Sequence, residues 1–317
     1  MNRHHIGLTL VSIWSITAFA QPVRSPSYLE GKSQVAEKIA NRTFVKPIVK
    51  KRVMDLQIAR EEADNIFSGN PVAAGKAKAA YRISENDEEY VFLSETIEYK
   101  LSKRSHAEHL MDLARYTVAE PTLCIDDDTA HAIAKSYVKR YLKQLPMGLL
   151  RHVRTAKLMD AVCRLGKSGN PEGETITQIA NFEVTFERSI NGVEVFGPGG
   201  KLHVYLARNG DVIGHSFILR EIEETMSTPS MRPKPYPEIE DRLLSILSRS
   251  ATDNTELLGV RLGYLERSRK TKQGEIPLAY MVEYSYGPHS KRLVNYYDAV
   301  TGLVLDPAAN TGMGDSR

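Results

Sequence analysis

The sequence predicts an α+β protein with two units, each a helix packed on an antiparallel sheet, after a less regular N-terminal region. Two helical patterns, at 130–142 and 238–250, are each followed by several extended segments. Asn-Gly pairs join apolar segments of the first unit, which favours tight hairpins. The 15 Tyr outnumber the 8 Phe, as is typical of half-exposed strands. A helix followed by hairpin-linked strands is the order of a helix-on-sheet layer.

Length and charge narrow the class of protein. The 317 residues, 42% of them hydrophobic, can fill the cores of two ordinary domains. The formal net charge is only +3, and the basic residues are scattered among 39 acidic ones. A nucleic-acid partner would need a concentrated basic surface, so we expect none.

The first 20 residues have the pattern of a secretory signal peptide. Arg3 and the two histidines after it form a positive start, residues 6–17 are apolar, and Ala18–Phe19–Ala20 is a small-x-small cleavage site. The apolar run is too short to span a bilayer comfortably. We therefore expect a soluble mature chain that begins near Gln21 and is periplasmic or secreted. An uncleaved membrane anchor is the alternative.

Residues 21–121 form an unassigned region that is expected to be partly helical. The prolines of 21–50 indicate a loosely ordered segment, whereas the apolar spacing of 53–67 predicts a helix. Residues 90–93 and 96–99 are predicted to be extended, and 107–116 a short helix.

The first regular unit spans 122–225. Its helix, 130–142, follows three aspartates that suit the positive end of the helix dipole and ends in Lys and Arg. Asn191–Gly192 and Asn209–Gly210 predict hairpin turns. Extended segments are predicted at 151–164, 178–190, 193–207 and 211–222.

A proline-rich linker, 226–237, precedes the second unit, 238–310. Its helix is predicted at 238–250, and alternating apolar residues predict the strands that follow. These strands lie at about 257–268, 277–287, 291–298 and 302–306.

Cys124 and Cys163 are the two cysteines of the chain. In an exported protein a single pair is most simply one disulfide, so we expect Cys124 to be bonded to Cys163. Two buried free thiols are the alternative.

Two hairpin sequences of the first unit resemble a known family. Residues 181–197 read NFEVTFERSINGVEVFG, and residues 202–213 read LHVYLARNGDVI. Both, in this order, are similar to the hairpins of thermolysin-type propeptides. In the second unit, AYMVEY at 279–284 and LVNYYDAVTGLVL at 293–305 resemble the last strands of the PepSY module.

The resemblance implies PepSY-like or cystatin-like units and a role beside peptidases. In that family the propeptide assists folding of a zinc peptidase and then inhibits it, but this sequence contains no H-E-x-x-H. The resemblance therefore implies a non-catalytic, exported binding module that modulates a protein partner, most simply a secreted peptidase. The alternatives are an envelope structural or interaction protein, the propeptide of a longer zymogen, and an enzyme of unrecognised type.

Three motifs invite a chemical role, and each has a simpler interpretation. His106 and His109 are three residues apart, whereas zinc peptidases need four on one helical face. Asp126–Asp128 lack the spacing of a calcium loop and fit a helix N-cap. Gly197–Gly200 lack the Lys-Ser/Thr of a phosphate loop. We expect no catalytic residue, no cofactor and no metal.

Aromatic residues of the strands are the candidate contacts with a partner. Alternation places Tyr280, Tyr284 and Tyr286 on one face of their strand. If a helix covers one face of the sheet, the other is a tyrosine-rich surface suited to binding. The candidate anchors are Tyr280, Tyr284, Tyr286, Tyr296, Phe182 and Phe186, with ordinary core packing as the alternative.

Overall fold

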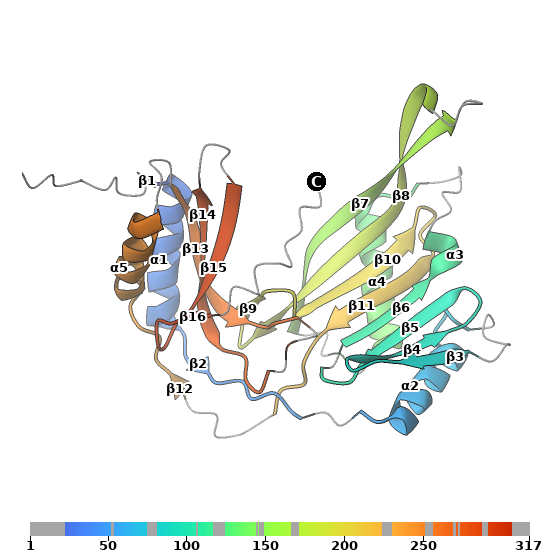
Figure 1. Cartoon of the computed structure of the whole chain (residues 1–317), viewed down its shortest axis with the longest axis horizontal. Helices are drawn as coiled ribbons and strands as arrows, with labels where there is room; N and C mark the ends of the chain where they lie inside the picture. Colours follow the sequence, from blue (N-terminus) through green and yellow to red (C-terminus); the bar gives the residue numbers. More distant parts are fainter. Residues whose placement is uncertain are drawn as a thin grey trace, which may run out of the picture.

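A computed structural model gives the fold of the chain (Figure 1). It describes residues 23–51, 54–74, 81–105, 107–116, 124–143, 145, 149–165, 171–223, 230–250, 256–268, 271, 273–286 and 291–305. For 160–165, 171–178, 243, 245–250, 286 and 291 it describes the backbone alone. The fold is α+β, with a large, mostly antiparallel sheet and few helices, which confirms the predicted class. Within these residues, no helix is long and apolar enough to cross a membrane.

The elements follow one another along the chain with helices interspersed among strands. The helices are α1 (Pro26–Asn41), α2 (Leu56–Gly69), α3 (Leu113–Tyr116), α4 (Asp127–Tyr141) and α5 (Tyr236–Ser250). The strands up to the middle of the chain are β1 (Val23–Arg24), β2 (Phe44–Val45), β3 (Arg82–Glu85), β4 (Glu89–Leu93), β5 (Ile97–Ser102), β6 (Ala107–Asp112), β7 (Leu150–Leu165) and β8 (Pro171–Ile190). The later strands are β9 (Val193–Phe196), β10 (Lys201–Ala207), β11 (Val212–Ile218), β12 (Ser230–Met231), β13 (Glu256–Leu265), β14 (Leu278–Tyr286), β15 (Lys291–Asp298) and β16 (Val304–Leu305).

The main sheet runs in the order β16-β15-β14-β13-β9-β8-β10-β11-β6-β5-β4-β3, with β7 paired to β8 and β1 to β13. Neighbours pair antiparallel, except that β13 pairs parallel with β1 and β9. Two separate hydrophobic cores form on this sheet. The short β9 joins the part that carries one core to the part that carries the other.

The larger core lies between helices α2 and α4 and strands β4, β5, β6, β8, β10 and β11. The helix predicted at 130–142 is α4, which begins three residues earlier, because the side chain of Asp126 caps it by accepting a hydrogen bond from the Thr129 amide at 2.7 Å. Its buried face, which includes Ala134 and Val138, lies over inward-facing strand residues such as Phe182 and Val204. The predicted helix at 53–67 is α2, which begins a few residues later after an Asp55 cap.

The smaller core lies between helices α1 and α5 and strands β13 to β15 (Figure 1). The prediction that residues 21–50 are loosely ordered is wrong, because Pro26–Asn41 is a helix. Pro26 stands at the start of the helix, where proline is tolerated, and Ser25 caps it. Gly31 allows close contact with the sheet, since a Cβ there would lie 2.6 Å from the Val260 carbonyl oxygen.

The predicted hairpin turns are confirmed by the backbone. Asn191 and Gly192 both have positive φ, 49° and 72°, as the mirror-image turn of a two-residue hairpin requires. The turn after β15 is held by Asp298, whose side chain accepts from the amides of Val300 and Thr301. The extended segment predicted at 193–207 is interrupted by Gly197–Gly200 and forms two strands, β9 and β10.

The short helix predicted at 107–116 is wrong over most of its length. Residues 107–112 are strand β6, and only Leu113–Tyr116 are helical. Glu108 and Asp112 are buried, so the apolar and polar residues do not alternate as they would on a strand with one solvated face. The spacing of the apolar residues therefore fitted either structure.

Candidate functional site

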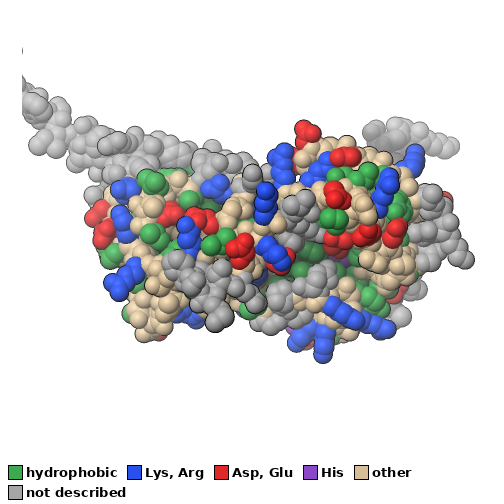
Figure 2. All heavy atoms as spheres, turned by 90° about the horizontal axis from the view of Figure 1, so that it is seen from below, with side chains coloured by type: hydrophobic (Ala, Val, Ile, Leu, Met, Phe, Trp, Pro, Cys, Tyr) green, Lys and Arg blue, Asp and Glu red, His purple; other side chains and the backbone are tan. Residues whose placement is uncertain are grey.

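A cleft of about 1940 Å³ lies at the ends of α2 and α4. The last turns of both helices, the ends of β8 and β11, and two extended segments, 45–51 and 219–223, border it. Tyr99, Glu108 and Phe217 reach it from β5, β6 and β11. Seen from below, the molecule carries hydrophobic side chains between charged ones (Figure 2).

The border of the cleft is amphipathic. Leu149 is 43% exposed, and Tyr141 beside it is half-buried. Arg140 and Lys143 are exposed at the end of α4, and the Arg140 guanidinium lies 5.3 Å from the centre of the Tyr141 ring. A surface that combines apolar area and charge in this way can bind a segment of a polypeptide chain.

A chain of four buried polar side chains ends in the wall of the cleft. The Asn70 side-chain amide lies 2.8 Å from the Tyr137 hydroxyl, which lies 2.8 Å from His215 Nδ1. His215 Nε2 lies 2.7 Å from Glu108 Oε1. The exposed fractions are 3% for Asn70, 4% for Tyr137, 0% for His215 and 8% for Glu108. Asn70 and Glu108, the two ends of the chain, line the cleft.

Tyr137 links the groups of this network through its hydroxyl. Burial raises the pKa of its phenol well above the ordinary value, because the phenolate would lose its hydration. The hydroxyl therefore stays protonated and donates. The chain resembles a catalytic relay in its order of carboxylate, imidazole and hydroxyl, but here the hydroxyl end is enclosed.

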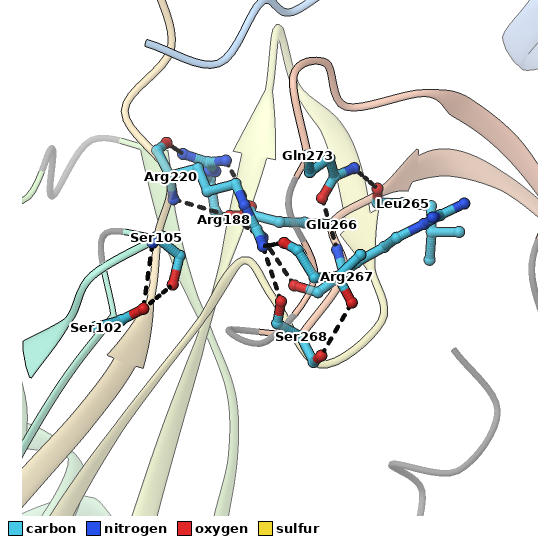
Figure 3. A network of polar contacts seen from close by, with 10 residues as sticks. Ser102, Ser105, Arg188, Arg220, Leu265, Glu266, Arg267, Ser268 and Gln273 are labelled. Carbon is cyan, nitrogen blue, oxygen red and sulfur yellow. Dashed lines mark hydrogen bonds and ion pairs between the residues drawn. The ribbon is translucent and has the colours of Figure 1, made fainter. Parts of the chain in front are cut away.

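A second buried network stands at the junction of the two cores (Figure 3). The carboxylate of Glu266, just after β13, accepts from Arg188 Nη2 at 2.5 Å and from the Arg220 amide at 2.8 Å. Arg188 Nη1 also donates to the Arg220 carbonyl oxygen at 2.6 Å. The side chain of Glu266 is 0% exposed, and those of Arg188 and Arg220 are 6% and 1% exposed. Both arginines line the cleft.

Backbone carbonyls complete the surroundings of Arg220. Its guanidinium donates to the carbonyl oxygens of Arg267, Ser268 and Thr271 at 2.7–2.8 Å. Burial raises the pKa of the Glu266 carboxyl and lowers the pKa of Arg220, and each charge opposes the effect of burial on the other. Two cations and one anion therefore hold the ends of β8, β11 and β13 together.

The aromatic residues expected to contact a partner lie in the cores, which corrects their interpretation as a binding surface. Phe182 and Phe186 pack in the larger core, and Tyr280 and Tyr284 in the smaller. Tyr296 is 3% exposed on the opposite face of the sheet, where Phe196 and Met281 cover it. Both faces of β14 and β15 are thus covered, and no tyrosine-rich surface remains at these positions. The side chain of Tyr286 lies outside the described residues.

The remaining candidate motifs take structural positions. Cys124 is an exposed free thiol, so the structure does not show the expected disulfide; the side chain of Cys163 lies outside the described residues. Asp126 is the N-cap of α4. His109 lies on β6 near Glu98, at 3.6 Å, and His106 lies outside the described residues. Gly197–Gly200 connect β9 to β10, packed on Glu266. The described residues contain no group of three or more His, Cys, Asp or Glu that could hold a metal.

Sequence reasoning missed every member of the two buried networks. Their partners are far apart in the chain, as with Glu108 and His215, which are 107 residues apart. One local signal was available. His215 and Arg188 each stand at an inward position of a strand whose neighbouring inward positions are apolar, where a polar residue needs a partner.

Comparison with known proteins adds information on the fold only. No protein-family model matches the chain, and no curated protein matches it. An uncharacterized protein from Eubacterium rectale ATCC 33656 has a similar structure, with a TM-score of 0.51 and 11% identity over 83% of this chain and 86% of that one. At this identity the similarity shows a shared fold alone. The Bacillus megaterium YpeB C-terminal domain aligns at 13% identity over 80% of this chain and 97% of that one, but its TM-score of 0.36 does not establish a shared fold.

Proposed function

We propose that this protein is a non-catalytic binding module that holds an extended segment of a partner polypeptide in the cleft. The volume of the cleft, about 1940 Å³, carries the proposal. Small-molecule sites usually enclose about 300–1,000 Å³. A cleft about twice that size, with exposed apolar and charged groups at its border, is suited to several residues of a peptide chain.

The partner we propose is a secreted peptidase, which the protein inhibits or helps to fold. The resemblance of 181–213 and 279–305 to propeptide and PepSY sequences supports this class of partner. It also supports a division into two PepSY-like units, one around each hydrophobic core. The signal-peptide pattern of residues 1–20 supports export to the compartment where such peptidases act.

The chemistry of the cleft favours binding over catalysis. Arg188, Arg220 and Glu266 neutralise one another and hold strand ends, and the Tyr137 hydroxyl is enclosed. None of these groups combines an activated nucleophile with a base at an open position.

The test is capture of a partner with the mature protein, followed by a peptidase assay with and without it. Leu149→Asp places a charge on an exposed apolar residue of the cleft, and we expect it to abolish capture without unfolding the protein. Leu29→Asp is the matched control, because Leu29 is 51% exposed on α1 and does not line the cleft. Equal capture by both variants would contradict the cleft as the binding site. A captured partner without peptidase activity would indicate an envelope protein instead.

A further inference from the structure

Glu108 is a carboxylate in the wall of the cleft that forms no ion pair with a lysine or arginine of the described residues. It is 8% exposed and lines the cleft. Its hydrogen-bonding partner is His215 Nε2, at 2.7 Å, and no lysine or arginine of the described residues forms an ion pair with it. Other acids of the same region are paired, as Glu266 is with Arg188 and Glu221 with Lys50.

The hydrogen bonds behind Glu108 are all satisfied when His215 is neutral. The Asn70 carbonyl oxygen accepts from the Val72 amide at 3.0 Å, so the Asn70 side-chain NH₂ donates to Tyr137. In this neutral form the Tyr137 hydroxyl, which also lies 3.2 Å from Asn70 Oδ1, donates to His215 Nδ1, and the proton on His215 Nε2 points at Glu108. In this arrangement each of the hydrogen bonds that link these four side chains is donated in the direction of the Glu108 carboxylate. With His215 neutral, these four side chains carry one net negative charge, at the end that faces the cleft.

A buried charge without a counter-ion is unfavourable, and a cationic ligand group would relieve it. Phe217 lies directly opposite Glu108 in the β6–β11 register, and Tyr99 reaches the cleft from neighbouring β5. A carboxylate beside aromatic rings is the setting in which ammonium and guanidinium groups bind well.

We propose that Glu108 is a recognition site for a lysine or arginine side chain of the segment bound in the cleft. This rests on the proposed function and names the chemistry of the segment. The exposed cations of the border, such as Arg140 and Lys143, do not prevent it. Salt screens exposed charges over about 8 Å, whereas the buried Glu108 is screened much less.

Two peptides that differ in one charge test the proposal. The probes are acetylated, amidated Ala-Ala-Arg-Ala-Ala and the same peptide with citrulline, which is nearly the same shape but neutral. Both are titrated into the mature protein and followed by NMR or calorimetry. We expect the arginine peptide to bind at least about tenfold more tightly, a difference of about 1.4 kcal/mol. In Glu108→Gln, which keeps an acceptor for His215, we expect the ratio to fall to about one.

Glu223→Gln is the matched control, because Glu223 also lines the cleft but is exposed. It should keep the preference for arginine. A thermal melt checks that Glu108→Gln is folded. If the variant is not folded, the ratio of the two peptides' affinities for the protein without the substitution tests the proposal. Equal affinity for the two peptides would overturn the inference while leaving segment binding intact. Binding of neither peptide would overturn the inference and would also count against segment binding in the cleft. Spermidine that binds through Glu108 where the arginine peptide does not would also overturn it, since the site would then take free polyamines.

Discussion

Replacing Glu266 with glutamine should weaken the whole fold, because the change leaves two arginines buried without their anion. The amide has the same shape and can still accept from the Arg220 amide. Its NH₂ group, however, would face the Arg188 guanidinium, which is also a donor. Arg220 keeps three carbonyl acceptors, and Arg188 keeps the Arg220 carbonyl oxygen, so the loss is chiefly one of charge.

Removing one member of a buried ion pair costs about 3–5 kcal/mol, which is a large part of the roughly 5–15 kcal/mol that stabilises a typical fold. With a slope of about 3 kcal/mol per molar urea, the unfolding midpoint of Glu266→Gln should fall by about 1–1.7 M. Urea titration followed by circular dichroism measures this. Glu275→Gln is the control, because Glu275 pairs with Lys46 at the surface and should leave the midpoint nearly unchanged. A loss of less than about 1 kcal/mol in Glu266→Gln would refute the reasoning, since the arginines would then not depend on this carboxylate.

Three further predictions concern the pH dependence of stability and the effect of adding a Cβ at two glycines. The hydrogen bond from His203 lowers the pKa of Glu183 to about 2. The contribution of the Glu183 carboxylate to stability is therefore present above the ordinary pKa of 4.5 and is lost as the pH falls toward 2. In Glu183→Gln, the urea midpoint should depend less on pH over that interval. Burial lowers the pKa of His131 below 6.5, so the unfolded chain takes up a proton at a higher pH than the folded chain does. Stability therefore falls as the pH drops from 7 to 5. In His131→Gln, urea titrations should show a smaller decline over this interval. Gly200→Ala should lower the melting temperature, because φ is +71° and the new Cβ would lie 2.6 Å from a strand side chain, whereas Gly69→Ala, with nothing within 4 Å, should maintain or raise it.

Local chemistry explains which parts of the fold could be predicted from the sequence. Hairpins were predictable because Asn191–Gly192 readily adopts positive φ at both residues, which few other residue pairs do. Helix α4 was predictable because its cap, its acidic start and its basic end all lie within one segment. Helix α1 was not, because Pro26 and Gly31 usually indicate a loop, and only the contact with the sheet shows why they are suited to this helix.

The candidate site depends on contacts between distant residues, which explains why local patterns did not predict it. Alternation correctly placed Tyr280 and Tyr284 on one face, but it does not tell which faces of a sheet are covered. Here both are, the second by the cluster that includes Phe196 and Tyr296. The cleft is likewise lined by residues far apart in the chain, from Val45 to Glu223.

The pairing of the chain's first described helix with a late strand has a consequence for synthesis. Ser25 donates to the carbonyl of Leu258, 233 residues further on, and α1 packs on β13. A growing chain emerges from its N-terminus, so α1 leaves the ribosome long before the strands that will cover its apolar face. The residues of the larger core, which end near Leu219, are all available earlier. Helix α1 is therefore the described segment that stays unpacked longest during synthesis. In that interval a chaperone or a protease can bind its apolar face.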